Sequence, residues 1–242
     1  MQVPTSMLAA NAASDADSKH AEAYRYLRER IVSLELAPAS VLDEQALADA
    51  IGVGLTPVRQ ALRRLAWESL VVILPRRGTI VADLHPADIE HIFEMRLELE
   101  ALAAELAAQR ATPAELAALD GLVAETRAEL DGGNDPDTLI ALDRATHGAL
   151  WEASGNGQLV RTLDWLYVHV LRLWNYALPR IEGIPALTAD HFAIVEAVKA
   201  RDGAAARRRM HDHVQGFQLA FRAAWSGVGR PHPRADAVPG DH

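Results

Sequence analysis

Apolar residues recur at helical spacing along most of this chain, and a short β-rich interval interrupts them near residue 75. The first apolar stripe predicts a helix that ends before Pro38. Two runs rich in β-branched residues, Leu70–Leu74 and Thr79–Ala82, flank the sequence Pro75-Arg76-Arg77-Gly78. Because a short glycine-containing interval between such runs is typical of a turn, we expect a β-hairpin with two arginines at its tip.

Two short helices are expected between the first helix and the hairpin. Asp43 is a candidate N-cap of the first, and Gly52 ends it. Thr56 is the expected N-cap of the second, with Pro57 at its first position, where the missing N–H costs nothing. The predicted buried stripe of that helix consists of Val58, Leu62 and Leu65. Helix, turn, helix and hairpin in this order predict a winged helix-turn-helix over residues 21–84.

From residue 85 onward the apolar stripes keep the helical period, and no run alternates as a strand would. Proline and glycine positions divide this block into six helices. The expected spans are Pro86–Arg110, Pro113–Leu130, Pro136–Ala153, Gln158–Leu178, Ala186–Ala200 and Ala204–Trp225. The short segments that connect these helices predict an antiparallel six-helix bundle over residues 85–226. The expected fold class is therefore mainly α.

The two ends of the chain lack a hydrophobic period. Residues 1–20 are rich in Ala, Ser and Asp, which predicts a disordered arm, and the composition of residues 227–242 predicts a flexible tail. No run of apolar residues is long enough to span a membrane, and the N-terminus lacks the pattern of a secretory signal. We therefore expect a cytoplasmic protein without a membrane partner.

Charge is distributed unevenly, and its distribution decides which partners remain possible. The net charge is −9, yet residues 21–84 hold eight basic and eight acidic residues, whereas residues 85–242 hold fifteen and twenty-three. Residues 55–66 carry three arginines and no acid. Local charge governs contact with phosphate, so the composition does not exclude nucleic acid. The absence of cysteine excludes disulfides and thiolate metal sites.

The helix after Gly54 carries side chains suited to DNA. Near its N-terminus the outer face presents Thr56, Arg59, Gln60 and Arg63. Arginine binds guanine through paired hydrogen bonds or binds phosphate, and a helix N-terminus favours phosphate. Arg76 and Arg77 at the hairpin tip can enter the adjacent minor groove. A small domain with a solvated basic face is the alternative, but the agreement of cap, turn, stripe and hairpin favours double-stranded DNA.

The segment GVGLTPVRQALRRLAWESLV, followed by PRRGTIVADL, resembles the GntR superfamily of bacterial transcription regulators. The helical block resembles the effector domain of the FadR subfamily, and six helices resemble its VanR-like branch. The resemblance covers about residues 21–224. It implies a homodimer whose recognition helices lie about one DNA turn apart on a pseudo-palindromic operator.

The chain departs from the GntR pattern in two places. The family usually has a polar residue and then arginine where this chain has Gly54 and Leu55, and arginine is frequent where Gln45 stands. Both of these positions often contact DNA in relatives. We hypothesise that Leu55 replaces a guanine contact with an apolar one, for example to a thymine methyl, so that the operator sequence differs.

Four residues of the helical block are candidate metal ligands. Asp143 and His147 are four apart on one helix face, His191 opens a later helix and His213 lies in the last one. One carboxylate and three imidazoles suit Zn²⁺, Ni²⁺ or Mn²⁺ and leave positions for water or a ligand. Taken alone, scattered histidines are more commonly explained by capping or core packing than by a metal. The resemblance favours a metal, because metal-containing domains of the subfamily carry Asp-x-x-x-His and two later histidines at this spacing.

An effector that bears a carboxylate is expected beside this metal. Arg96, which matches a family position that points toward the cavity, and Arg172 are candidates to bind it. His169 shares a helix face with Arg172 and is a candidate for the pocket wall or, less strongly, for an extra ligand. An interhelical ion pair is the alternative for either arginine.

These patterns predict a ligand-responsive transcription factor, expected to be a repressor that leaves its operator when a small organic acid binds at the metal. One alternative is a regulator for which the ion itself is the signal. The other is a metal-dependent enzyme, although neither an HExxH helix nor a nucleophile triad accompanies the histidines.

Overall fold

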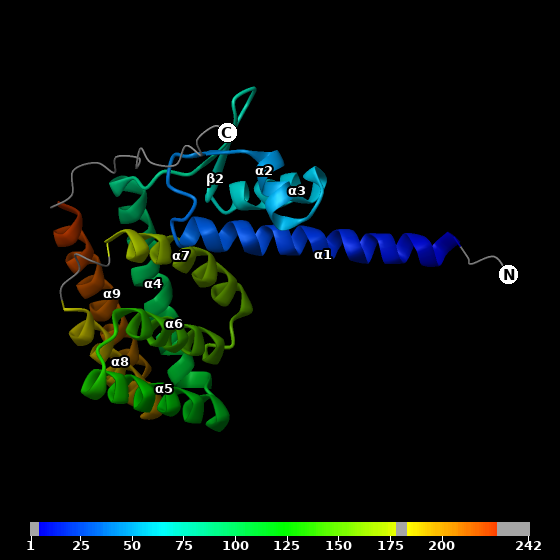
Figure 1. Ribbon diagram of the computed structural model, residues 1–242. Coiled ribbons are helices and arrows are strands. Elements are labelled where there is room, and N and C mark those ends of the chain that lie inside the picture. Colours follow the sequence, from blue (N-terminus) through cyan, green and yellow to red (C-terminus); the bar gives the residue numbers. More distant parts are fainter. Residues whose placement is uncertain (1–4, 178–182, 227–242) are drawn as a thin grey trace. The chain divides into compact units, whose positions relative to one another are not determined.

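The computed structural model describes residues 5–177 and 183–226 (Figure 1). It divides into two compact units between Leu84 and His85. Within the described residues, the first unit contains three helices and a three-stranded sheet, and the second contains six helices. This architecture confirms the predicted fold class.

The first unit has the order of elements expected for a winged helix-turn-helix. Its elements are α1 (Thr5–Val32), β1 (Val41–Leu42), α2 (Glu44–Ile51), α3 (Leu55–Trp67), β2 (Val71–Leu74) and β3 (Gly78–Val81). The strands are antiparallel in the order β1-β3-β2. Helix α3 packs against α1, α2 and β2, as Figure 1 shows. The predicted stripe of α3 lies in this core, because Val58, Leu62 and Leu65 are all buried.

Helix α2 begins and ends at the predicted residues. The side chain of Asp43 accepts hydrogen bonds from the backbone N–H groups of Gln45 and Ala46, which have no partner within the helix. Gly52 follows the last turn with φ 76°, a left-handed conformation that glycine adopts without steric cost. This glycine therefore turns the chain from α2 toward α3.

The prediction that Thr56 caps α3 is wrong. Gly54 is the N-cap, with an extended backbone, and the helix begins at Leu55. Pro57 is therefore the third helical residue, where its missing N–H still costs nothing because the first turn has no intrahelical acceptors. No side chain caps this end of α3. Its first N–H groups consequently remain free to bind an anion.

The expected disordered arm over residues 1–20 also needs correction, because α1 begins at Thr5. The sequence-based prediction relied on apolar residues that recur at helical spacing, and residues 1–20 lack this pattern. Alanine, however, has the highest helix propensity, and extending an existing helix is easier than nucleating a new one. The predicted first helix can therefore continue toward the N-terminus without an apolar stripe.

The sheet contains one strand that the sequence did not predict. Strand β1 is only two residues long, and it pairs Val41 with Ile80 and Leu42 with Thr79. Two residues are too few to show an alternating pattern. The predicted hairpin itself is present, with Leu74 paired to Gly78 across the tip.

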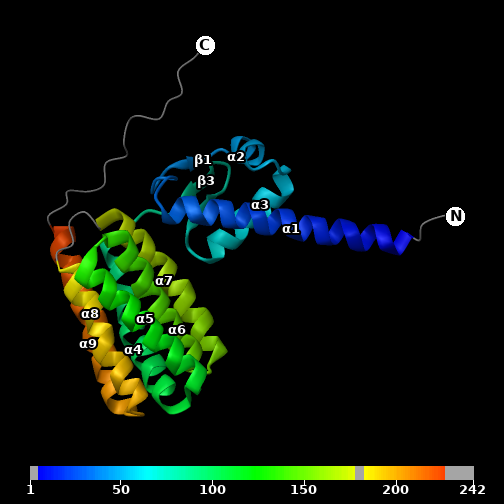
Figure 2. The same ribbon diagram turned by 60° about the horizontal axis from the view of Figure 1, so that its bottom comes forward.

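The second unit is a bundle whose helices lie roughly along one direction (Figure 2). They are α4 (Pro86–Arg110), α5 (Pro113–Gly132), α6 (Pro136–Ala153), α7 (Gly157–Ala177), α8 (Ile184–Lys199) and α9 (Gly203–Ser226). Helix α4 contacts α6, α7, α8 and α9, so it occupies the middle of the bundle. Within the described ranges, no helix combines the length and apolar character that crossing a bilayer requires.

The bounds of these helices follow local capping chemistry. Thr112 and Glu115 form a capping box at α5, and the Asp135 side chain accepts from the backbone of Thr138 at α6. Helix α8 begins two residues before its predicted start, directly after Gly183. Leu178, the predicted end of α7, and the predicted tail at 227–242 lie outside the described residues.

Candidate metal centre and DNA-reading face

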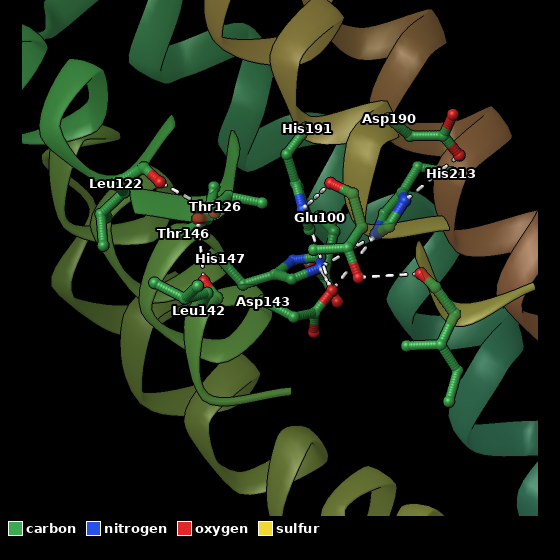
Figure 3. Close-up of polar contacts among 12 residues, drawn as sticks. Glu100, Leu122, Thr126, Leu142, Asp143, Thr146, His147, Asp190, His191 and His213 are labelled. Carbon is green, nitrogen blue, oxygen red and sulfur yellow. Dashed lines mark hydrogen bonds and ion pairs between the residues drawn. The ribbon is translucent and has the colours of Figure 1, made fainter. Parts of the chain in front are cut away.

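Four buried side chains meet in the core of the bundle (Figure 3). Asp143 and His147 come from α6, His191 from α8 and His213 from α9. One potential ligand atom of each lies within 4.8 Å of the other three. The structure therefore brings together the four residues that the sequence singled out.

The distances within this group suit one ion. The Nε2 atoms of His147 and His213 are 3.1 Å apart, and Asp143 Oδ1 lies 3.7 Å from His191 Nε2. Ligands that each lie about 2.1 Å from one ion are roughly 3.0–3.4 Å from each other. His191 Nε2 is also buried without a hydrogen-bond partner among the described residues, which is costly unless something else binds it. A divalent cation would satisfy this nitrogen.

A polar group faces the second nitrogen of each imidazole. His147 Nδ1 contacts the carboxylate of Glu100 on α4, and His191 Nδ1 lies 3.2 Å from the carbonyl oxygen of Thr188. His213 Nδ1 lies 3.6 Å from Asp190 Oδ2, which is too far for a hydrogen bond. Outer partners fix the ring orientation of metal-binding histidines, and those of His147 and His191 leave both Nε2 atoms facing Asp143. Sequence reasoning missed these partners. Glu100 and Asp190 lie on other helices than the histidines they face, and Thr188, three residues before His191, offers only a backbone carbonyl.

Glu100 is a fully buried carboxylate at the base of this site. Arg96 Nε donates to Glu100 Oε1 at 2.6 Å, and Trp151 Nε1 donates to Oε2 at 3.3 Å. Burial acts to raise the pKa of Glu100, but the positive charges of Arg96 and His147 outweigh it and hold this pKa well below its usual value. Glu100 therefore stays ionised and accepts hydrogen bonds from all three partners.

The charge states of Asp143 and His191 favour a cation, whereas at His147 the carboxylates of Glu100 and Asp143 outweigh burial and raise the pKa, so that an ion would displace a proton there. Burial acts to raise the pKa of Asp143, but the three histidines and a 2.7 Å hydrogen bond from Tyr167 lower it. Burial, reinforced by His213, holds the pKa of His191 well below its usual value. An anionic carboxylate and a neutral imidazole are the forms that bind metal.

The DNA-reading candidates of the first unit lie on its surface. Thr56, Arg59, Gln60 and Arg63 are all exposed along α3, and Leu55 is half-buried at its start. Arg59 Nε lies 2.7 Å from Glu44 Oε2. Gln45 donates to Asp49 Oδ1 at 2.9 Å. Two of the residues expected to contact DNA, Arg59 and Gln45, thus interact with neighbouring acidic side chains.

Arg76 and Arg77 form the exposed tip of the hairpin. The backbone N–H of Arg77 donates to the carbonyl of Leu74 at 3.1 Å, and Arg76 has φ 63°. A left-handed conformation costs a non-glycine residue roughly 1–2 kcal/mol. This conformation belongs to the tight turn that joins β2 to β3.

Comparison with known families identifies both units. The model for bacterial regulatory proteins of the gntR family matches residues 19–81, and the FCD domain model matches residues 91–216. The chain belongs to the GntR family. This GntR regulator thus combines a DNA-binding helix-turn-helix with an FCD effector domain, and its relatives are transcriptional regulators rather than enzymes.

The GntR regulator is 34% identical over 198 residues to an HTH-type transcriptional regulator in an unstable DNA locus of Streptomyces ambofaciens, covering 79% of this chain and 80% of that protein. It is 30% identical to the HTH-type regulator YdhC of Bacillus subtilis, covering 78% and 85%. The solved structure of E. coli McbR/YncC matches with a TM-score of 0.73 at 22% identity, covering 86% of this chain and 98% of that one. That likeness shows the shared fold.

The cavity beside the four ligands of the GntR regulator is small. Its volume is about 10 Å³, which is room for about one water molecule. It is lined by Arg96, Asp143, His147, Val170, Trp174, His213 and Phe217. Of the three effector candidates, Arg96 is therefore at the cavity. Arg172 and His169 are buried on α7 outside this described lining, and the His169 ring packs on Trp165 at 5.5 Å.

The ion pair of Arg59 with Glu44 leads to a first prediction. In the unmodified protein the Glu44 carboxylate competes with DNA phosphate for Arg59. Glu44→Gln removes this ion pair and should strengthen binding of the GntR regulator to duplex DNA by about two- to fivefold, because a surface ion pair contributes at most about 1 kcal/mol. Fluorescence anisotropy with a labelled duplex measures this affinity. Glu35→Gln is the matched control, because Glu35 is an exposed acid paired with Arg30. Equal gains for both variants would show that only net charge matters.

Proposed function

We propose that this regulator holds one divalent ion through Asp143, His147, His191 and His213, and that a small carboxylate-bearing effector bound beside the ion controls its release from DNA. The observation that supports this most is the convergence of three Nε2 atoms and one carboxylate oxygen, with His213 Nε2 lying 3.1 Å from His147 Nε2 and 3.9 Å from Asp143 Oδ1. Glu100 at His147 Nδ1 and the Thr188 carbonyl at His191 Nδ1 also orient two of the three rings, which packing alone does not require.

The donor set suits Zn²⁺, Ni²⁺ or Mn²⁺, because all four ligands are nitrogen or oxygen atoms. When bound, the ion would supply open coordination positions for a carboxylate. The side chains that hold it come from α6, α8 and α9, so the same ion would also join three helices of the bundle.

The effector is proposed to reach Arg96 and the ion together. Arg96 already pairs with Glu100, so an incoming carboxylate would compete with Glu100 for the guanidinium. Because the cavity has room for about one water molecule, side chains such as Trp174 and Phe217 would have to move. Arg172 and His169 would contact the effector only if these movements enlarged the cavity. Movement of these packed side chains is how effector binding would favour one arrangement of the bundle, with a coupling of typically 1–3 kcal/mol.

On the DNA side, we propose a homodimeric repressor that binds a pseudo-palindromic operator with half-sites about one turn apart. The α3 helix would enter the major groove and the hairpin tip the adjacent minor groove. The proposed contacts are Gln45, Leu55, Thr56, Arg59, Gln60, Arg63, Arg76 and Arg77.

This proposal is tested on untreated, full-length protein. We expect elemental analysis to find one divalent ion per chain, and selection from a random duplex library to yield a pseudo-palindrome. At saturating metal, one class of small organic acid should weaken operator binding by about 5–150-fold. Release of DNA that depends on the ion alone would identify a metal sensor instead. A folded protein that takes up no divalent ion on titration would refute the metal site.

A further inference from the structure

Trp67 is the most exposed of the large apolar side chains that the structure describes. This last residue of α3 is 90% exposed, and Ile73 on the neighbouring strand β2 is 48% exposed. Both line a shallow hollow together with Arg63 and Ala66. We refer to these four residues as the α3–β2 notch. Exposed apolar side chains that gather at one hollow usually mark an interaction surface.

The notch continues the face of α3 that carries the DNA-reading residues. Gln60, Arg63 and Trp67 are three and four residues apart, so their side chains lie on one side of the helix. On its other side the notch is bounded by β2, the first arm of the hairpin whose tip carries Arg76 and Arg77. The notch therefore lies between the two elements that are expected to contact DNA.

This position defines what can occupy the notch. With α3 in the major groove and the hairpin tip in the adjacent minor groove, one sugar–phosphate strand separates the two grooves. That strand must pass between the helix and the hairpin. The α3–β2 notch, which is lined by residues of both elements, is a candidate for the path of this strand.

The charge of the notch fits a polyanion. Arg59 is paired with Glu44 and Arg64 with Glu68, whereas Arg63 has no ion pair or hydrogen bond with any part of the chain that the structure describes. No acidic side chain lines the notch. The Trp67 indole adds an apolar face that can cover a deoxyribose and an N–H that can donate to a phosphate.

We propose that the α3–β2 notch binds the sugar–phosphate backbone of duplex DNA, with Trp67 against a deoxyribose and Arg63 on an adjacent phosphate. The inference rests on α3 being the recognition helix. Backbone contacts position a protein on DNA without reading its sequence, so this surface contributes affinity for any duplex.

The test uses the full-length protein and a fluorescein-labelled, mixed-sequence duplex of about three helical turns. Anisotropy titrations between about 50 and 200 mM salt give the affinity and its salt dependence. Trp67→Ala should weaken binding by about three- to tenfold at every salt concentration, because it removes apolar contact but no charge. Trp67→Phe should restore most of the loss. Arg63→Gln should reduce the slope of log K against log salt by about 0.9, the effect of one phosphate contact.

Val41→Ala is the matched control, because Val41 is 71% exposed on β1, at the opposite edge of the sheet. It should bind as the unmodified protein does. Wild-type duplex affinity of Trp67→Ala overturns the inference. So does a loss of self-association in sedimentation with unchanged DNA affinity, which would make the notch a protein interface. The affinity ratio between a selected operator and the mixed duplex reports separately on the proposed function, so the two ideas can fail independently.

Discussion

Replacing Glu100 with alanine should lower the free energy of unfolding of the FCD domain by about 3–5 kcal/mol. Glu100 is fully buried and Arg96 is 3% exposed, so the variant leaves the guanidinium in a dry core without a counter-charge. The variant also removes the carboxylate at His147 Nδ1 and the acceptor for Trp151. Urea unfolding of metal-free protein, followed by circular dichroism, measures this effect without a contribution from the ion.

Glu98→Ala is the matched control for this experiment. Glu98 also lies on α4 and pairs with Arg207 at 3.0 Å, but its side chain is 68% exposed. Water screens such a pair, so its loss should cost less than about 1 kcal/mol. The double variant Arg96→Met with Glu100→Leu should recover much of the loss, because neither charge then remains buried. Equal stabilities of Glu98→Ala and Glu100→Ala would show that the buried ion pair is not a stabilising feature.

The second large effect is expected at the metal centre. His191→Ala should weaken Zn²⁺ binding by more than about 100-fold, because even the loss of an outer partner typically costs 10–100-fold. The Nε2 atom of His191 is buried without a hydrogen bond among the described residues. An ion at about 1,000 times its Kd stabilises a fold by about 4 kcal/mol, so the thermal stabilisation by added Zn²⁺ should also disappear. Competition with a chromogenic chelator gives the affinity, and thermal unfolding gives the linked stability.

His169→Ala separates ligation from a general loss of packing. His169 is a buried histidine like His191, but it lies on α7 outside the four-residue group. The His169→Ala variant should bind Zn²⁺ with the affinity of the unmodified protein, even if its free energy of unfolding falls. Loss of the ion in both variants to the same extent would mean that His169 is a fifth ligand or that packing, not coordination, is being measured.

The sequence by itself determined the features that depend on neighbours along the chain. Asp43 and Gly52 delimit α2, and the proline positions open α5 and α6, because capping is decided within one helical turn. Asp143 and His147 share a face because they are four residues apart on α6. The link from this pair to the two later histidines came from resemblance to a family, since spacing alone favoured capping or core packing.

Only the tertiary structure decided which distant groups meet. Glu100 on α4 and Tyr167 on α7 contact the ligands because the bundle packs these helices around α6, and no local pattern carries that information. The exposure of Trp67 likewise depends on the path of the hairpin, since the buried stripe of α3 is complete without it. Local spacing fixes which side chains share a face of one helix, but the packing of that helix against its neighbours fixes what the face contacts.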